Sequence, residues 1–287
     1  MEHVGAEPFY IGVASRKSGV HPSTIRLYES LSWIPAPERT AKGYRLFTEE
    51  LVARLQLTAR CLKVTALGPT IRKPAMALLS LNGAGAVASL VTTAEELIGA
   101  VQEELRLARE AVGVLSHYRE RLCANEDPVM VGSDLPGGPT ESKRLLKVSE
   151  AARLCGVTAD QIRNWERNGL LTIPRDSRSG YRLFGSEDLE RLLLTRLAVR
   201  SRFSLSAIRR VMRALDEALL GDASKGNGET LLERMIDTPT EDELAFFEPF
   251  PTDRWISTLN DALDQASVAR EIAMVIQSFP PVHGCGQ

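Results

Sequence analysis

An internal repeat organises this 287-residue chain. Shifting the sequence by 137 positions aligns two pairs of segments without a gap. IGVASRKSGVHPSTIRLYE (11–29) lies over VSEAARLCGVTADQIRNWE (148–166), and GYRLFTEELVARL (43–55) lies over GYRLFGSEDLERL (180–192). A repeat of this length predicts two copies of one structural unit, and any account of the fold must place both.

A fainter second match follows each copy. LAREAVGVLSHY (107–118) lies over VAREIAMVIQSF (268–279). Apolar residues recur here at spacings of three and four, which predicts a long helix packed along another helix after each copy. The two apolar stripes are Val101, Leu105, Ala108, Val112 and Leu115, and Leu259, Ala262, Ala266, Ala269, Ala273 and Ile276.

Charge is distributed unevenly along the chain. The net charge is −2, yet residues 10–75 and residues 146–213 each carry +7, and the remainder carries −16. Two equally basic segments in an acidic chain favour two surfaces that face a polyanion. The 44% hydrophobic content is that of a globular protein. With no apolar run of the roughly 20 residues that a membrane span needs, and no signal-peptide pattern, we expect a cytoplasmic protein without membrane contact.

Each copy begins with a predicted helix-turn-helix. In the second copy Gly156 ends a short helix, because glycine adopts the left-handed conformation of a helix C′ position without strain. Thr158 and Gln161 have the spacing of a capping box that opens the next helix. The first copy has Pro22 at the first helical position instead. The second helix of such a pair normally enters the major groove of DNA.

A two-stranded wing and two more helices are predicted to follow. Residues 33–47 contain prolines and then an alternating GYRLF segment, which indicates a hairpin with its turn near 40–43. Thr48 is a good N-cap for the third helix, and Ser204 for the fourth helix of the second copy. In the first copy, Pro69 suits a first helical turn, but we expect Pro74 to break a helix interior.

The combination of IRLYE (25–29) or IRNWE (162–166) with GYRLF resembles the MerR family of transcription regulators. The resemblance implies a mainly α fold with two winged helix-turn-helix domains, each followed by a coiled-coil-type helix. It also implies that polar side chains of the second helix face the groove, that Tyr28 and Trp165 lie against the sugar-phosphate backbone, and that the wings contact phosphates. The implied DNA-binding residues are Ser23, Thr24, Arg26, Tyr28, Arg39, Lys42, Tyr44 and Arg45, and Thr158, Gln161, Arg163, Trp165, Arg178, Tyr181 and Arg182. An alternative for Arg26 and Arg163 is an ion pair with Glu29 and Glu166, three residues further on.

The repeat and the resemblance together predict the domain organisation. In the family, the long helix pairs antiparallel with that of a second subunit, whereas here one chain supplies both helices. We therefore expect an intramolecular pseudo-dimer on promoter DNA, with a homodimer as the rival, and an indirect effect on RNA polymerase through bent or twisted DNA. The predicted segments are a first winged domain 8–78, a long helix 92–123, a linker 124–145, a second winged domain 146–220, an acidic and aromatic insert 221–253, and a long helix 254–279.

Other functions have weaker support. No nucleophile–base pair, metal cluster or phosphate loop indicates an enzyme. Cys123, His283 and Cys285 are too few for a closed metal site, so we predict no cofactor. Two further alternatives are a protein that sequesters a small molecule on the same fold, and an architectural or excision-directing DNA-binding protein. An effector is left open, and insert 221–253 is interpreted as a loop or as a ligand or partner surface.

Overall fold

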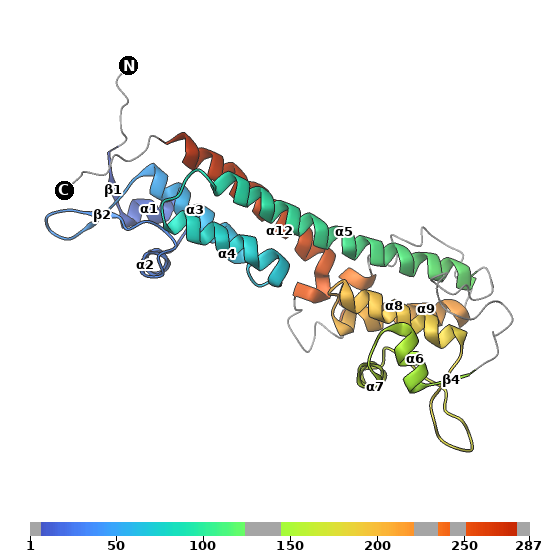
Figure 1. The fold of residues 1–287 in the computed structure, drawn as a ribbon. Helices are drawn as coiled ribbons and strands as arrows, with labels where there is room; N and C mark the ends of the chain where they lie inside the picture. The colour runs from blue at the N-terminus through green and yellow to red at the C-terminus, as the bar shows by residue number, and fades with distance from the viewer. Residues whose placement is uncertain (1–6, 124–144, 221–234, 242–250, 280–287) are drawn as a thin grey trace. The chain divides into compact units, whose positions relative to one another are not determined.

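The computed structural model describes residues 7–123, 145–220, 235–241 and 251–279 (Figure 1). Helices dominate and the strands are two or three residues long, which confirms the predicted mainly α class. The chain divides into two compact units, one of residues 1–103 with 259–287 and the other of residues 104–258. No helix in the described ranges has the length and apolar character needed to cross a bilayer.

The first unit contains a winged helix-turn-helix built around a small apolar core. Ile25, Phe47 and Leu55 are fully buried in it. The wing strands form an antiparallel sheet in the order β1-β3-β2, with Arg39 opposite Arg45 and Tyr10 opposite Leu46. The elements are β1 (Phe9–Tyr10), α1 (Ile11–Ser18), α2 (Pro22–Ser30), β2 (Glu38–Arg39), β3 (Arg45–Phe47), α3 (Glu49–Val64) and α4 (Pro69–Gly83).

Most of the predicted helix boundaries of this module are confirmed. Pro22 occupies the first turn of α2, and the Thr48 side chain accepts from the backbone N–H of Leu51 at the start of α3. The N-cap of α2 was not foreseen: His21 Nδ1 accepts from the backbone N–H of Ser23. The expectation for Pro74 was wrong, because α4 continues through it. Pro74 lies early in α4, and the buried Ala75, Leu78 and Leu79 anchor the helix beyond it.

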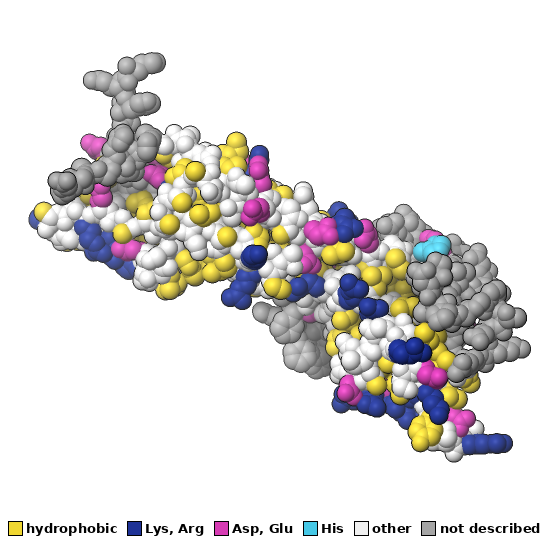
Figure 2. Space-filling view, in the orientation of Figure 1, with side chains coloured by type: hydrophobic (Ala, Val, Ile, Leu, Met, Phe, Trp, Pro, Cys, Tyr) yellow, Lys and Arg dark blue, Asp and Glu magenta, His cyan; other side chains and the backbone are white. Residues whose placement is uncertain are grey.

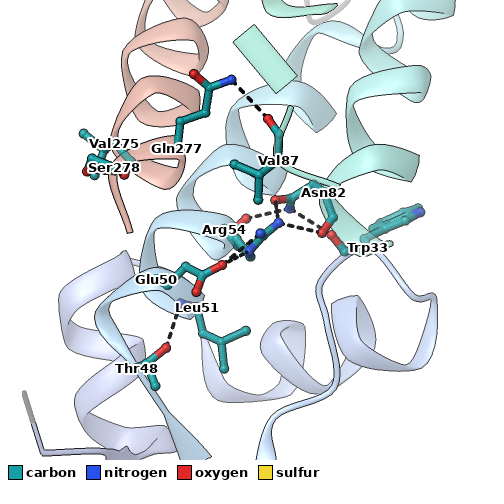
Figure 3. Close-up of polar contacts among 10 residues, drawn as sticks. All are labelled: Trp33, Thr48, Glu50, Leu51, Arg54, Asn82, Val87, Val275, Gln277 and Ser278. Atoms are coloured by element: carbon teal, nitrogen blue, oxygen red, sulfur yellow. Dashed lines mark hydrogen bonds and ion pairs between the residues drawn. The ribbon is translucent and has the colours of Figure 1, made fainter. Parts of the chain in front are cut away.

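Two long helices complete the first unit, and each belongs to it only in part. They are α5 (Leu90–Cys123), which contributes its residues up to 103, and α12 (Trp255–Ser278), which contributes its residues from 259. Gln277 Nε2 donates to the carbonyl of Val87 (3.1 Å), and Arg270 Nε donates to Glu95 Oε1 (3.0 Å), so the two segments run antiparallel (Figure 3). Every residue of both predicted apolar stripes is buried, at 5% exposure or less.

The second unit repeats the module. Gly156 ends α6 in the left-handed conformation (φ 61°), and Thr158 and Gln161 form the predicted capping box. Ser201 Oγ donates to the carbonyl of Leu107, which joins the module to the second part of α5. The elements are β4 (Leu146–Lys147), α6 (Val148–Cys155), α7 (Ala159–Arg167), β5 (Leu183–Phe184), α8 (Ser186–Arg200), α9 (Leu205–Leu220) and η1 (Pro251–Arg254).

Part of the 221–253 insert is packed into the second unit. Ile236 is fully buried, and the Asp237 carboxylate accepts from the backbone N–H groups of Ile256 (2.7 Å) and Ser257 (3.0 Å) in the first turn of α12. Arg210 of α9 donates to the carbonyls of Met235 and Ile236. These residues therefore form a cap on the start of α12 rather than a loop. The glycines and all three phenylalanines of the insert lie outside the described residues, as does nearly all of the predicted linker.

Candidate nucleic-acid interface

The second helix of each module has one buried and one exposed face. Ile25 of α2 and Ile162 of α7 are fully buried, whereas Arg26 and Arg163 are exposed beside them. Because positions three apart lie on the same side of a helix, Tyr28 and Trp165 follow the isoleucines inward. We call α2 and α7 the recognition helices, and their exposed faces are the candidate surfaces for DNA.

Tyr28 and Trp165 are consequently largely buried. Their exposed fractions are 7% and 4%, and Tyr28 packs against Trp33 with ring centroids 5.8 Å apart. Burial also raises the pKa of the Tyr28 hydroxyl above its ordinary value. The helical phase turns both rings toward the module cores, and their contact with the sugar-phosphate backbone stays a prediction that only the small exposed part of each ring can fulfil.

Some polar residues near the N-termini of the recognition helices are exposed, and others form capping hydrogen bonds. Ser23 is exposed and its hydroxyl lies 2.7 Å from His21 Nδ1, whereas Thr24 is half-buried. In the second module the Thr158 hydroxyl accepts from the backbone N–H of Gln161 (3.1 Å). The Gln161 Oε1 atom in turn accepts from the backbone N–H of Thr158 (2.8 Å). The capping box thus fixes two side chains that were predicted to face the groove.

One carboxylate joins each recognition helix to its wing. Glu29 accepts from Arg45 Nε (2.5 Å) and from Arg39 Nη2 (3.2 Å). Glu166 accepts from Arg182 Nε (2.7 Å) and lies 3.6 Å from Arg175 Nη2. We call each set of one glutamate and two arginines a wing clamp.

The wing clamps replace the alternative that Glu29 and Glu166 pair with Arg26 and Arg163. Both glutamates bind wing arginines, and Arg163 pairs instead with Asp160, three residues earlier (2.5 Å). The matching position in α2 is Ser23, which carries no charge. The first recognition helix therefore presents Arg26 without that neighbouring carboxylate.

The wing tips are the most open parts of the modules. Tyr44 and Tyr181 are 62% and 68% exposed, and Lys42 and Arg178 are also exposed. The Tyr44 ring meets Tyr10 edge-on, with centroids 6.1 Å apart. Figure 2 shows Lys and Arg side chains gathered over the wing region of each module. Such open donors suit phosphate oxygens.

The turn of the second wing is held by Asp176. Its carboxylate accepts from the backbone N–H of Ser179 (2.6 Å), from the Ser179 hydroxyl (2.7 Å) and from the backbone N–H of Arg178 (3.1 Å). These hydrogen bonds, those from Ser179 first, lower the pKa of Asp176 below its ordinary value. An ionised Asp176 thus orders the turn that carries Arg178.

A buried polar network supports the first recognition helix from behind (Figure 3). Arg54 and Asn82 are 2% and 0% exposed. Arg54 donates from Nε to Glu50 Oε1 (2.9 Å) and from Nη1 to the Asn82 carbonyl (3.0 Å). Asn82 Nδ2 donates to the carbonyl of Trp33 (3.0 Å), just after the recognition helix. The network therefore connects α3 and the end of α4 to the segment that leads from α2 into the wing.

The two cysteines whose side chains the structure describes are not part of the exposed surface of the modules. Cys61 and Cys155 are buried, and desolvation raises the pKa of their thiols to about 12 and about 11. Within the described ranges, no three His, Cys, Asp or Glu side chains come together in a group that could hold a metal ion. The side chains of Cys123, His283 and Cys285 lie outside the described residues.

Sequence reasoning missed one feature of the recognition helices. Leu27 of α2 and Leu31, the C-cap residue of this helix, are 51% and 46% exposed, although leucine is usually buried. The 137-residue repeat places Asn164 and Asn168 at the same positions of the second module, and both are exposed. Comparing the two copies position by position, with the helical phase, could have found this difference.

Comparison with known proteins gives one family for both modules. The model of the MerR family regulatory protein matches residues 10–47, and that of the MerR HTH family regulatory protein matches residues 146–215. No solved structure was found to match the chain.

Curated relatives agree with this family. The mercuric resistance operon regulatory protein of Bacillus cereus is 50% identical over 18% of this chain and 39% of its own length. A probable heavy metal-dependent transcriptional regulator of Haemophilus influenzae is 41% identical over 25% of this chain and 56% of its own length. The chain thus spans 39% and 56% of these two relatives. The HTH-type transcriptional regulator YfmP of Bacillus subtilis is 30% identical over 39% of this chain and 86% of its own length. The chain, with a matching module in each half, belongs to the MerR family of helix-turn-helix regulatory proteins.

Proposed function

We propose that this chain is a sequence-specific regulator of transcription that binds double-stranded promoter DNA through both modules. The observation that carries the proposal is the repeated wing clamp. Glu29 and Glu166 each hold an arginine of the wing against the recognition helix. A module built this way can place a helix in the major groove and a wing on the adjacent phosphates as one rigid part.

The proposed contacts have two roles. Exposed residues of the recognition helices, Arg26 and Arg163 above all, reach base edges, because arginine pairs well with guanine in the major groove. The wing residues neutralise phosphates and fix the register, which carries no sequence information itself. The proposed phosphate contacts are Arg39, Lys42, Tyr44 and Arg45 in the first module and Arg178, Tyr181 and Arg182 in the second, and Ser23, Thr24, Thr158 and Gln161 lie at the helix N-termini.

We further propose that the two modules of a single chain bind the two half-sites of one operator. The α5–α12 contacts support this, because α12 follows the second module in sequence and yet belongs to the unit of the first module. The second part of α5 likewise belongs to the unit of the second module. We propose that one chain thereby binds two half-sites that are one or two helical turns of DNA apart. Bending or twisting the DNA between them would act on RNA polymerase indirectly.

Selection of the full-length chain against a pool of random duplexes tests the proposal. We expect an enriched imperfect palindrome, and binding to it that weakens steeply with salt as phosphate contacts release counterions. The upstream region of the chain's own gene is the first candidate for footprinting. A pool without any enriched sequence would refute a sequence-specific function. Binding of all duplexes alike would favour an architectural role.

A further inference from the structure

The two recognition helices align residue by residue but differ in the side chains on their exposed faces. Each has an arginine at the same exposed position, followed by Leu27 in α2 and by Asn164 in α7. Four residues later the same contrast recurs, with Leu31 against Asn168. One helix therefore presents an apolar strip beside its arginine, and the other presents two amides.

The exposure of Leu27 is not a by-product of packing. The core of the first module is filled by Ile25 and Tyr28, on the other side of the same helix. Leu27 is 51% exposed and follows the exposed Arg26 directly in α2. About half of the Leu27 side chain is therefore left uncovered in the free protein and is free to contact bound DNA.

We propose that the modules read different bases at equivalent positions: Leu27 contacts the methyl group of a thymine, and Asn164 pairs with an adenine. This inference rests on the proposed DNA-binding function and extends it to the half-sites. The thymine C5-methyl is the apolar feature of the major-groove edges, and a side chain without donors or acceptors can recognise it. An asparagine amide matches the N6 donor and N7 acceptor of adenine.

Hydrogen bonds from Asn168, the C-cap residue of α7, orient the Asn164 side chain. Asn168 Nδ2 donates to the carbonyl oxygen of Asn164 (2.7 Å) and to Asn164 Oδ1 (3.2 Å). An amide oxygen has two lone pairs, so Oδ1 retains the capacity to accept from adenine N6 while Nδ2 donates to N7. The ion pair of Arg163 with Asp160 holds that arginine back toward the helix N-terminus. In the first module Ser23 occupies the position of Asp160, so the half-sites should also differ in how strongly the arginine reads its base.

Single-atom changes in the DNA test the assignment with the full-length chain and its selected operator. Each thymine is replaced in turn by deoxyuridine, which lacks only the methyl group. We expect one thymine of the first half-site whose replacement weakens wild-type binding by a factor of about four, the worth of one buried methyl group. That penalty should vanish in Leu27→Ala. The matched control is Leu107→Ala, a change of another exposed leucine on α5, which should keep the full penalty.

The second half-site is tested in the same way. Replacing the critical adenine by 7-deazaadenine should weaken wild-type binding roughly fivefold or more and should leave Asn164→Ala unaffected. Leu27→Asn should shift the preference of the first half-site from thymine toward adenine. If no thymine methyl matters, or if its penalty persists in Leu27→Ala, the inference is wrong while sequence-specific binding stands. If the chain selects no sequence at all, the inference and the proposed function both fall.

Discussion

Glu29 accepts a hydrogen bond of 2.5 Å from Arg45 Nε, and Glu166 accepts one of 2.7 Å from Arg182 Nε in the second module. Each pair joins a recognition helix to a wing residue sixteen positions further along the chain. The arginines are half-buried, at 27% and 24% side-chain exposure, so each retains an open edge. The same guanidinium can thus hold the wing in place and face a phosphate, which is the basis of the first prediction.

Replacing both wing arginines, Arg45→Ala with Arg182→Ala, should weaken specific and nonspecific DNA binding alike. Each lost charge-assisted contact is worth about 1–3 kcal/mol, and Glu29 and Glu166 would each lose one of their two arginine partners. Titration of target and random duplexes at several salt concentrations measures the loss and the shallower salt slope. Arg106→Ala, which removes one exposed arginine of α5 outside both modules, is the control and should leave binding nearly unchanged. Unchanged retardation of the target duplex by the double variant would refute the wing assignment.

Gly83→Ala should destabilise the first unit. A Cβ at this position would overlap the carbonyl oxygen of Ser32, and the neighbouring Asn82 is fixed by the buried network with Arg54. The backbone cannot move away without breaking those hydrogen bonds, so we expect a loss of about 1–3 kcal/mol, typical of overpacking. Gly99→Ala is the control, because nothing lies within 4 Å of its added methyl. Denaturant unfolding should show a lower midpoint for Gly83→Ala and an equal or higher midpoint for Gly99→Ala.

The sequence predicted the local elements well because their signals are local. The caps at Thr48 and Thr158 and the glycine at 156 act within one helical turn, and each was found where expected. The buried stripes of the long helices follow from the 3.6-residue period. Pro74 was misjudged because packing of the rest of α4 outweighs the local cost of proline.

The candidate site was predicted less completely, because its contacts join distant positions. Arg54 and Asn82 are 28 positions apart in the chain, and no short sequence pattern predicts that they form a hydrogen bond. The wing clamps could not be predicted either, because only the folded chain brings Glu29 next to the wing arginines. The burial of Tyr28 and Trp165 follows from the helical phase of the buried isoleucines, whereas their DNA contact was inferred from the resemblance and stays a prediction.

The Asp176 carboxyl should titrate below an ordinary aspartate. Hydrogen bonds from Ser179 favour its ionised form. A carboxyl whose folded-state pKa is lowered stabilises the fold above its unfolded pKa, and that contribution is lost as the pH falls through the folded value. Below that pH the turn of the second wing should loosen. NMR titration of the side-chain carboxyl gives the midpoint, and Ser179→Ala should move it upward. A midpoint unaltered by Ser179→Ala would mean that the turn does not set this pKa.

Changing Cys123 and Cys285 together to serine should leave DNA binding intact and abolish thiol labelling of the native chain. The remaining thiols, Cys61 and Cys155, are buried with pKa values of about 12 and about 11, so almost none of either is the reactive thiolate at pH 7. Labelling with a thiol reagent should proceed only after denaturation. Loss of a response to metal or oxidant in this variant would contradict the prediction and identify a sensor.

One chain should be the functional unit in solution and on DNA. Both copies of the repeat are present, the apolar stripes of α5 and α12 are buried, and α12 from residue 259 onward belongs to the unit of the first module. A tether between two such helices gives a local concentration near millimolar, at about the level reached by short linkers, so at micromolar protein the intramolecular pairing should win. Light scattering should return the 31.5 kDa of a single chain, free and per operator. Twice that mass, or two chains on one operator, would favour a homodimer that exchanges helices between chains. The proposed DNA-binding role of each module would be unaffected, because it depends on contacts inside the module.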